Sequence, residues 1–186
     1  MKVSDMKKVD MVIFFFLFFL SGYGQNKVHS GFDVGYSHEG YVPITLYVGS
    51  GSTQYGLTVG VPTKTGTKGS YHPVINWTDF PENEDVVSEG EYYLPLMLNL
   101  SRPVNYNIYL GGGIGYAFKT SYRNLYDNSG TLGDYGHYYI KAPDKGKIDY
   151  IMFISYVLPS LDSSHHNIKL FYSGLMGFGA SFGFAF

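Results

Sequence analysis

Apolar and polar side chains alternate with a period of two along most of the chain after residue 25. This period places successive side chains on opposite faces of an extended strand, and none of this region has the 3.6-residue period of an amphipathic helix. The pattern predicts eight strands, at 28–36, 42–48, 54–61, 91–100, 104–119, 137–142, 147–158 and 168–186.

The connections between these predicted strands differ in length. Short turns are expected at 38–40, 49–52 and 102–103, and at Ala142-Pro143-Asp144-Lys145-Gly146, which has a typical turn composition. Longer polar loops are expected at 62–89 and 121–136, with a shorter one at 159–166. Short turns on one side and mostly longer loops on the other are typical of a bacterial outer-membrane barrel.

The two faces of the predicted strands differ in chemistry. One face carries Leu, Ile, Val, Phe and Tyr, whereas the other carries Gly, Ser, Thr, Asn and a few ions. The ions are Asp33, Glu91, Lys119, Asp149 and Lys169. In a bilayer every backbone N–H and C=O must be paired, so a β chain can span one only as a closed barrel. We therefore expect an all-β fold, an eight-stranded antiparallel up-and-down transmembrane β-barrel.

In this barrel the apolar face would contact lipid and the polar face would fill the interior. Eight strands leave room only for side chains inside, so the inward ions are expected to pair across the interior and to close it. Aromatic residues are expected at two rims, as in membrane proteins. The first rim would hold Tyr36, Tyr92, Tyr116, Phe118, Tyr156 and Tyr172, and the second Tyr106, Tyr150, Phe182, Phe184 and Phe186.

The first 24 residues read as a targeting segment. Lys2, Lys7 and Lys8 precede the ten-residue apolar run Met11 to Leu20, and small Gly22 and Gly24 follow it. This order is typical of a secretory signal peptide, and the run is too short for a membrane-spanning helix. The expected organisation is a signal peptide at 1–24 and a barrel at 25–186, exported to the bacterial outer membrane.

Composition excludes several classes of protein. Aromatic residues make up 18% of the chain and charged residues 15%, which argues against intrinsic disorder. The net charge is -2, so nucleic acid is not expected as a partner. The chain has no cysteine, which excludes disulfides, thiolate zinc sites and cysteine nucleophiles.

Two stretches carry a resemblance to a known family. The closing stretch 179–186, GASFGFAF, resembles the C-terminal insertion signal of outer-membrane barrels, and 109–116, YLGGGIGY, resembles strands of OmpA- and OmpX-type small barrels. The resemblance implies that Phe182, Phe184 and Phe186 form the assembly signal read by the barrel-assembly machinery. The family is functionally diverse, so the resemblance does not identify the activity.

The longest predicted loop contains an apolar cluster formed by Tyr71, Val74, Ile75, Trp77 and Phe80. Such side chains in a loop exposed to water either pack on one another or contact a partner. Since Trp and Tyr are frequent anchors of interfaces, Tyr71, Trp77 and Phe80 are the candidate partner-binding residues. The expected function is a non-enzymatic outer-membrane protein that binds a surface partner or a larger membrane assembly.

Candidate chemistry is weaker. His165-His166 are adjacent and point to opposite sides of an extended chain, and the acidic run Glu82, Glu84, Asp85 and Glu89 lacks calcium-loop spacing. We therefore expect neither a metal nor a cofactor. One rival is an outer-membrane lipid-modifying enzyme using Ser88 with His72 or His137. The other is a soluble periplasmic barrel that binds an apolar ligand, which requires Leu94, Leu96 and Leu98 to face inward.

Overall fold

The structure is a computed structural model that describes residues 28–50, 53–73, 84–158 and 165–185. These residues form β-strands and no helix. The strands are β1 (Val28–Ser37), β2 (Tyr41–Ser50), β3 (Thr53–Pro62), β4 (Ser70–Tyr71), β5 (Glu84–Pro103), β6 (Ile108–Asp127), β7 (His137–Leu158), β8 (His165–Ser173) and β9 (Gly177–Ala185). No helix suited by length and hydropathy to crossing a membrane occurs among the described residues.

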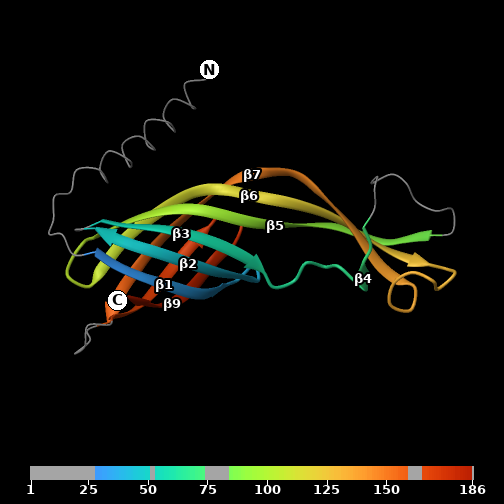
Figure 1. Ribbon diagram of the computed structural model, residues 1–186. Coiled ribbons are helices and arrows are strands. Elements are labelled where there is room, and N and C mark those ends of the chain that lie inside the picture. Colours follow the sequence, from blue (N-terminus) through green and yellow to red (C-terminus); the bar gives the residue numbers. More distant parts are fainter. Residues whose placement is uncertain (1–27, 51–52, 74–83, 159–164, 186) are drawn as a thin grey trace, which may run out of the picture.

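Eight of the strands close into a ring (Figure 1). Its order is β1, β2, β3, β5, β6, β7, β8 and β9, and pairing of β9 with β1 completes the circle. Each neighbouring pair in the ring is antiparallel. The short strand β4 lies outside the ring and runs parallel to β7. The predicted all-β class and the ring of eight antiparallel strands are confirmed.

The ring has two distinct ends. At the terminal end β1 begins and β9 ends, with Gly31 opposite Ala185. At the turn end lie the β1–β2 turn at 38–40 and the β8–β9 turn at 174–176. The amide of His38 donates to the carbonyl of Phe178 over 2.7 Å, which ties these two turns together.

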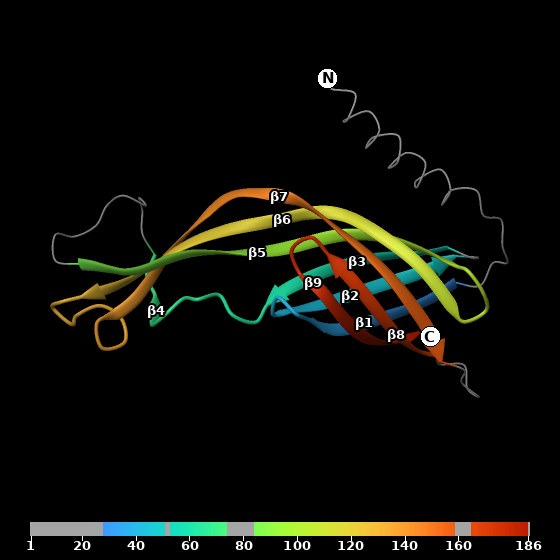
Figure 2. The ribbon, with the colours of Figure 1, turned by 180° about the vertical axis from the view of Figure 1, so that it is seen from behind.

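Strands β5, β6 and β7 have 20, 20 and 22 residues and extend far beyond the turn end of the ring (Figures 1 and 2). Residues 84–94, 117–127 and 137–147 of these strands form what we call the protruding sheet. Much of this part was expected to be loop at 62–89 and 121–136, and that expectation is wrong for residues 84–89 and 121–127.

The predicted turn at Pro143-Asp144-Lys145-Gly146 is also wrong. Residues 137–158 form the single strand β7, and the register against β6 shifts between Ala117 and Lys119 to accommodate one extra residue of β7. A proline is tolerated in a strand at an edge or a bulge, and Pro143 lies on an edge of the sheet next to this register shift. Local turn composition was therefore outweighed by pairing with β6.

The expected last strand, 168–186, is instead two strands. It breaks at Gly174-Leu175-Met176, where the Ser173 hydroxyl accepts hydrogen bonds from the amides of Leu175 and Met176. Gly177 has φ +67°, a conformation that favours glycine at the end of the turn. The two errors offset each other, so the expected number of strands in the ring is correct although several strand boundaries are not.

These errors also move two aromatic side chains between rims. Tyr150 lies toward the turn end, where Asp149 beside it accepts from Ser173, and Tyr156 lies toward the terminal end opposite Ile108. The sequence-based assignment had these two tyrosines at the opposite rims, because it gave residues 147–158 the wrong direction. Phe182, at the terminal end, and Tyr36, at the turn end, lie where they were expected.

The outer surface of the ring is apolar and exposed. Each ring strand contributes at least one large apolar side chain that is 40% or more exposed: Val34, Leu46, Leu57, Leu98, Ile114, Met152, Leu170 and Phe178. We call these residues and their outward-facing apolar neighbours the apolar belt. A soluble protein rarely exposes so extensive an apolar surface.

The interior of the ring has two layers. Toward the terminal end it is polar, with Asp33, Thr45, Asn99 and Lys169 buried. Toward the turn end it is mixed, because Tyr41, Met97, Ile151, Phe171 and Met176 form one buried apolar cluster and Asp149 and Ser173 are also buried there. The expected polar interior is therefore correct toward the terminal end. Toward the turn end, polar residues are joined by an apolar cluster from β2, β5, β7, β8 and the β8–β9 turn.

Candidate functional site

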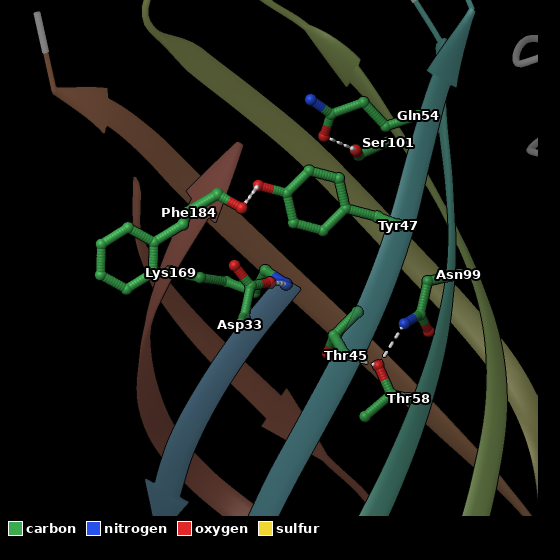
Figure 3. A network of polar contacts seen from close by, with 9 residues as sticks. All are labelled: Asp33, Thr45, Tyr47, Gln54, Thr58, Asn99, Ser101, Lys169 and Phe184. Carbon is green, nitrogen blue, oxygen red and sulfur yellow. Dashed lines mark hydrogen bonds and ion pairs between the residues drawn. The ribbon is translucent and has the colours of Figure 1, made fainter. Parts of the chain in front are cut away.

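The polar layer of the interior is a connected set of side chains (Figure 3). Lys169 of β8 forms an ion pair with Asp33 of β1, and both are at least nine-tenths buried. Burying one of these charges without the other is strongly unfavourable, so the pair is needed to keep either inside. The expected pairing of inward ions across the interior is confirmed for these two residues.

Hydroxyl and amide groups complete this layer. Thr45 and Thr58 share a hydrogen bond of 2.7 Å, and the Asn99 amide donates to Thr58. The Tyr47 hydroxyl donates to the Phe184 carbonyl over 3.1 Å (Figure 3). The cavity among these groups has a volume of only about 20 Å³, room for about one water molecule. This interior therefore offers no room for an organic ligand.

The protruding sheet offers much more accessible chemistry. Its inner face continues the inward face of the ring, because β5 and β6 keep an unbroken register from Pro103 opposite Tyr109 to Ser88 opposite Asn124. This inner face carries an ion ladder. Arg123 Nε lies 2.5 Å from Glu89, and Lys119 Nζ lies 2.6 Å from Glu91 and 3.1 Å from Asp144.

The ladder fixes the charge states of its members. The hydrogen bond from Lys119, and after it that from the Tyr93 hydroxyl, lowers the pKa of Glu91. The backbone amide of Lys145 and then Lys119 lower the pKa of Asp144. Hydrogen bonds to both carboxylates raise the pKa of Lys119. All three groups are therefore charged at neutral pH.

An open hollow of about 610 Å³ lies along this ladder. Its lining includes Glu89, Glu91, Ser121, Arg123 and Asp144. The carboxylates of Glu89 and Glu91 stay accessible, with side-chain exposures of 54% and 47%. A surface of this kind suits a polar or charged partner rather than an apolar one.

The loop that closes the β6–β7 hairpin is ordered by Asp127. Its carboxylate accepts hydrogen bonds from the amides and hydroxyls of Ser129 and Thr131 and from the amide of Leu132, over 2.6–2.9 Å. These bonds, first that of the Ser129 hydroxyl, lower the pKa of Asp127. The loop holds Tyr135 outward, 97% exposed and with φ 54°.

The segment between β3 and β4, which we call the strap (residues 63–69), is fastened to the sheet by Asn124. This side chain accepts from the amide of Lys68 over 2.8 Å and donates to the carbonyl of Gly66 and to the Ser88 hydroxyl. Asn124 is 2% exposed, so its hydrogen bonds are shielded from water. Leu125, the next residue of β6, belongs to a small buried core with Tyr138 and Ile140.

The candidate partner-binding residues fall in two groups. Tyr71 lies on β4, is 47% exposed, and has its ring 5.6 Å from that of Tyr139. The Lys141 ammonium lies 4.6 Å from the centre of the same ring. Trp77 and Phe80 lie outside the described residues. The structure therefore places Tyr71 on the outer edge of the protruding sheet and does not bear on the rest of the cluster.

The candidate assembly signal lies on β9 at the terminal end. The rings of Phe182 and Phe184 are 5.2 Å apart, and that of His166 lies 5.7 and 4.9 Å from them. Phe182 is 45% exposed on the outside of the ring. Phe186 lies outside the described residues.

The residues of the enzyme rival have other partners. The Ser88 hydroxyl accepts from Asn124, the His72 ring lies 5.7 Å from that of Tyr138, and the His137 ring lies 4.9 Å from that of Tyr126. No group of three or more His, Asp or Glu side chains in the described part of the chain is placed to hold a metal ion. Of the acidic run, Asp85 accepts from Asn128 and Glu89 pairs with Arg123.

Sequence reasoning expected Glu91 and Lys119 to pair, as they do, but it missed Glu89, Arg123 and Asp144 as members of the ion ladder. The signal for it is that acidic residues 89 and 91 are two positions apart and basic residues 119 and 123 are four positions apart. Such spacings place each pair on one face of a strand. Comparison with known proteins adds no assignment: no protein-family model matches the chain, and neither does any curated protein. The geometry of the ring and of the protruding sheet is therefore the basis on which function is inferred.

Proposed function

We propose that this protein is a non-enzymatic β-barrel of the bacterial outer membrane, whose protruding sheet binds a protein partner outside the cell. The ring would span the bilayer, with its terminal end toward the periplasm and its turn end outward. The first 24 residues would be removed on export. The partners would thus be outer-membrane lipids, the barrel-assembly machinery during insertion, and a protein at the outer surface.

The observation that carries this proposal is the apolar belt. Large apolar side chains are exposed on every strand of the ring, whereas charged Asp33, Asp149 and Lys169 are buried inside it. This arrangement is the reverse of a soluble protein and matches a chain whose outer surface faces hydrocarbon. Closure of the ring pairs the edges of its strands, as a lipid-embedded sheet requires.

Recognition is the proposed function because long parts of β5, β6 and β7 lie beyond the ring, in the protruding sheet. The protruding sheet has its own small core, an ordered tip loop and a fastened strap, so it presents a rigid surface. Rigid loops and strands that stand clear of a membrane are suited to contact other molecules. Tyr71 belongs to this surface. Trp77 and Phe80 remain candidate partner-binding residues from the sequence.

Cell fractionation with a heat-modifiability gel tests the membrane assignment. The folded protein is expected in the outer-membrane fraction, resistant to carbonate extraction, and its mobility is expected to change on boiling. Recovery in the soluble periplasmic fraction, without a mobility change, would contradict the proposal.

A photo-crosslinking residue at position 71 tests recognition in living cells. Specific protein adducts are expected there, and none at position 98, which belongs to the apolar belt and serves as the matched control. Absence of specific adducts at position 71 would count against a partner at β4.

One observation argues against the first rival function, and one experiment tests the second. The soluble barrel with an apolar interior requires Leu94, Leu96 and Leu98 inside, yet they are 40%, 38% and 70% exposed. The enzyme rival predicts that replacing Ser88, His72 or His137 abolishes a lipid-modifying activity while the ring stays folded. A lipid A profile that is unchanged by these substitutions argues against it.

A further inference from the structure

The protruding sheet has two long edges whose backbone groups pair with no described strand. On β5 this edge covers residues 85–93, since pairing with β3 stops at Leu96 opposite Val59. On β7 it covers 141–149, since β8 begins to pair at Ile151 and β4 pairs only with Tyr138 and Tyr139. An unpaired edge is a template for pairing with another chain, and proteins usually protect such edges.

The β7 edge is protected in the usual ways. It carries exposed Lys141, Lys145 and Lys147, the register shift opposite Ala117, and Pro143, which has no N–H to donate. Lysine, proline and bulges on an edge strand all discourage addition of a further strand. The β7 edge is thus a poor site for strand addition.

The β5 edge is built differently over most of its length. Its own register shift against β6 lies near one end, between Val86 and Ser88, and residues 88–93 keep an unbroken register. Residues 85–93 read DVVSEGEYY, with no proline and no lysine and with strand-favouring Val and Tyr. Val86 and Val87 are 49% and 47% exposed. The regular stretch 88–93 offers about 20 Å of backbone for pairing.

The β5 edge also has a definite charge. Asp85 is exposed, and the carboxylates of Glu89 and Glu91 remain about half exposed even though Arg123 and Lys119 contact them. Two β5 edges from separate copies would bring like charges together and repel each other. The β7 edge of a second copy is basic but is interrupted by Pro143.

We propose that the β5 edge at 85–93 binds an extended, basic segment of a partner protein as an added strand. This inference rests on the proposed recognition function and names the chemistry of the partner. Backbone hydrogen bonds along the edge provide affinity, as in other cases of strand addition. Lysine or arginine side chains of the segment lie near Glu89 and Glu91, which share one face of β5, and provide specificity.

The test uses the full chain folded in detergent micelles and a fluorescent ten-residue peptide of alternating Lys and Val or Thr. Fluorescence anisotropy is expected to report saturable binding. Two adjacent N-methyl groups at the centre of the peptide block both of its edges and are expected to weaken binding at least tenfold. A peptide with Glu in place of Lys is expected to bind at least tenfold more weakly as well.

Hydrogen–deuterium exchange locates the site. The Lys peptide is expected to slow exchange of amides within 85–93 and to leave 141–149 unchanged. The double variant Glu89→Gln, Glu91→Gln is expected to bind the peptide several-fold more weakly, whereas Asp134→Asn, which removes an acid from the tip loop, is the matched control and is expected to bind normally.

Several results would overturn the inference. Equal binding of the methylated and unmethylated peptides would mean that the peptide binds through its charge without strand pairing. Slower exchange confined to 141–149 would mean that the peptide binds the β7 edge and not the β5 edge. No binding by a protein that retains its heat-modifiability would reject strand addition at β5 while leaving the membrane assignment intact. Loss of heat-modifiability in the unaltered chain would instead reject the proposed function itself.

Discussion

Lys169 of β8 and Asp33 of β1 form an ion pair across the interior of the ring, although β9 lies between their strands. The pair therefore links strands that do not share a hydrogen-bonded ladder. Lys169 Nζ also lies 4.8 Å from the centre of the Phe153 ring on β7. These contacts connect β1 with the neighbouring strands β7 and β8 at one buried point.

Removing one member of this pair should be costly. Lys169→Met leaves the Asp33 carboxylate buried without its partner, and the free energy of unfolding is expected to fall by about 3–5 kcal/mol. Urea unfolding in lipid vesicles, followed by the mobility of the folded form on a gel, measures the change.

The double variant Asp33→Leu, Lys169→Met is the control for this experiment. Because it removes both charges and fills the space with apolar side chains, it is expected to lose much less stability than either single variant. A Lys169→Met protein as stable as the unaltered chain would show that the pair does not hold the interior.

The inward position of Asp33 and Lys169 could be predicted from alternation alone, because a side-chain period of two assigns the face of each residue. Their pairing could not, since it depends on how the ring closes. The misplaced turn at Pro143 has a related cause. Turn composition is local information, whereas the pairing of β7 with β6 brings Asp144 to Lys119 from far along the chain.

The protruding sheet was largely read as loop for a different reason. Charged and polar side chains interrupt the apolar ones in 84–89 and 121–127, so these residues have no apolar period that distinguishes them from polar loops. The break after Ser173 was missed because the apolar pattern continues through the turn. Met176 lies in the turn but keeps the period of two, because it packs in the buried cluster with Met97.

Two glycines on β6 make a matched test of which face is inside. Gly115 faces inward, and a methyl group there would overlap the Leu96 carbonyl and come within 2.6 Å of Met97 Cα. Gly112 faces outward, and the nearest atom to a methyl group there is the Ile151 carbonyl oxygen at 3.2 Å. Gly115→Ala is expected to destabilise the ring by about 1–3 kcal/mol.

Gly112→Ala should be close to neutral, because the added methyl group projects into the apolar belt. The yield of heat-modifiable protein and the urea midpoint of both variants measure the difference. Equal losses in the two variants would contradict the assignment of the inner and outer faces.

Asn124 should control the strap. Asn124→Ala removes three hydrogen bonds that fasten residues 66, 68 and 88, and buried hydrogen bonds contribute about 1 kcal/mol each. The strap is expected to open more often, so trypsin should cut after Lys64 and Lys68 roughly tenfold faster or more.

Ser121→Ala is the matched control for the strap, since Ser121 donates to Asp144 and not to the strap. Limited proteolysis with mass spectrometry identifies the cut sites, and a heat-modifiability gel verifies that the ring persists. Unchanged cleavage in Asn124→Ala would mean that β4 pairing alone holds the strap.

Asp127 should make the order of the tip loop depend on pH. Its pKa in the folded chain is lowered by the hydrogen bonds from Ser129, Thr131 and Leu132, whereas an unfolded aspartate titrates near about 3.9. A lowered folded pKa means that the ionised carboxylate stabilises the loop above about pH 4, and this contribution is lost as the pH falls through the lowered pKa.

Asp127→Asn, which removes the ionised form, is expected to loosen the loop already at pH 7. Amide chemical shifts and exchange rates at 129, 131 and 132 measure this, with Asp134→Asn as the variant expected to resemble the unaltered chain. A tip loop that keeps its shifts in Asp127→Asn would mean that the three positive-φ glycines, Gly130, Gly133 and Gly136, suffice to hold its shape.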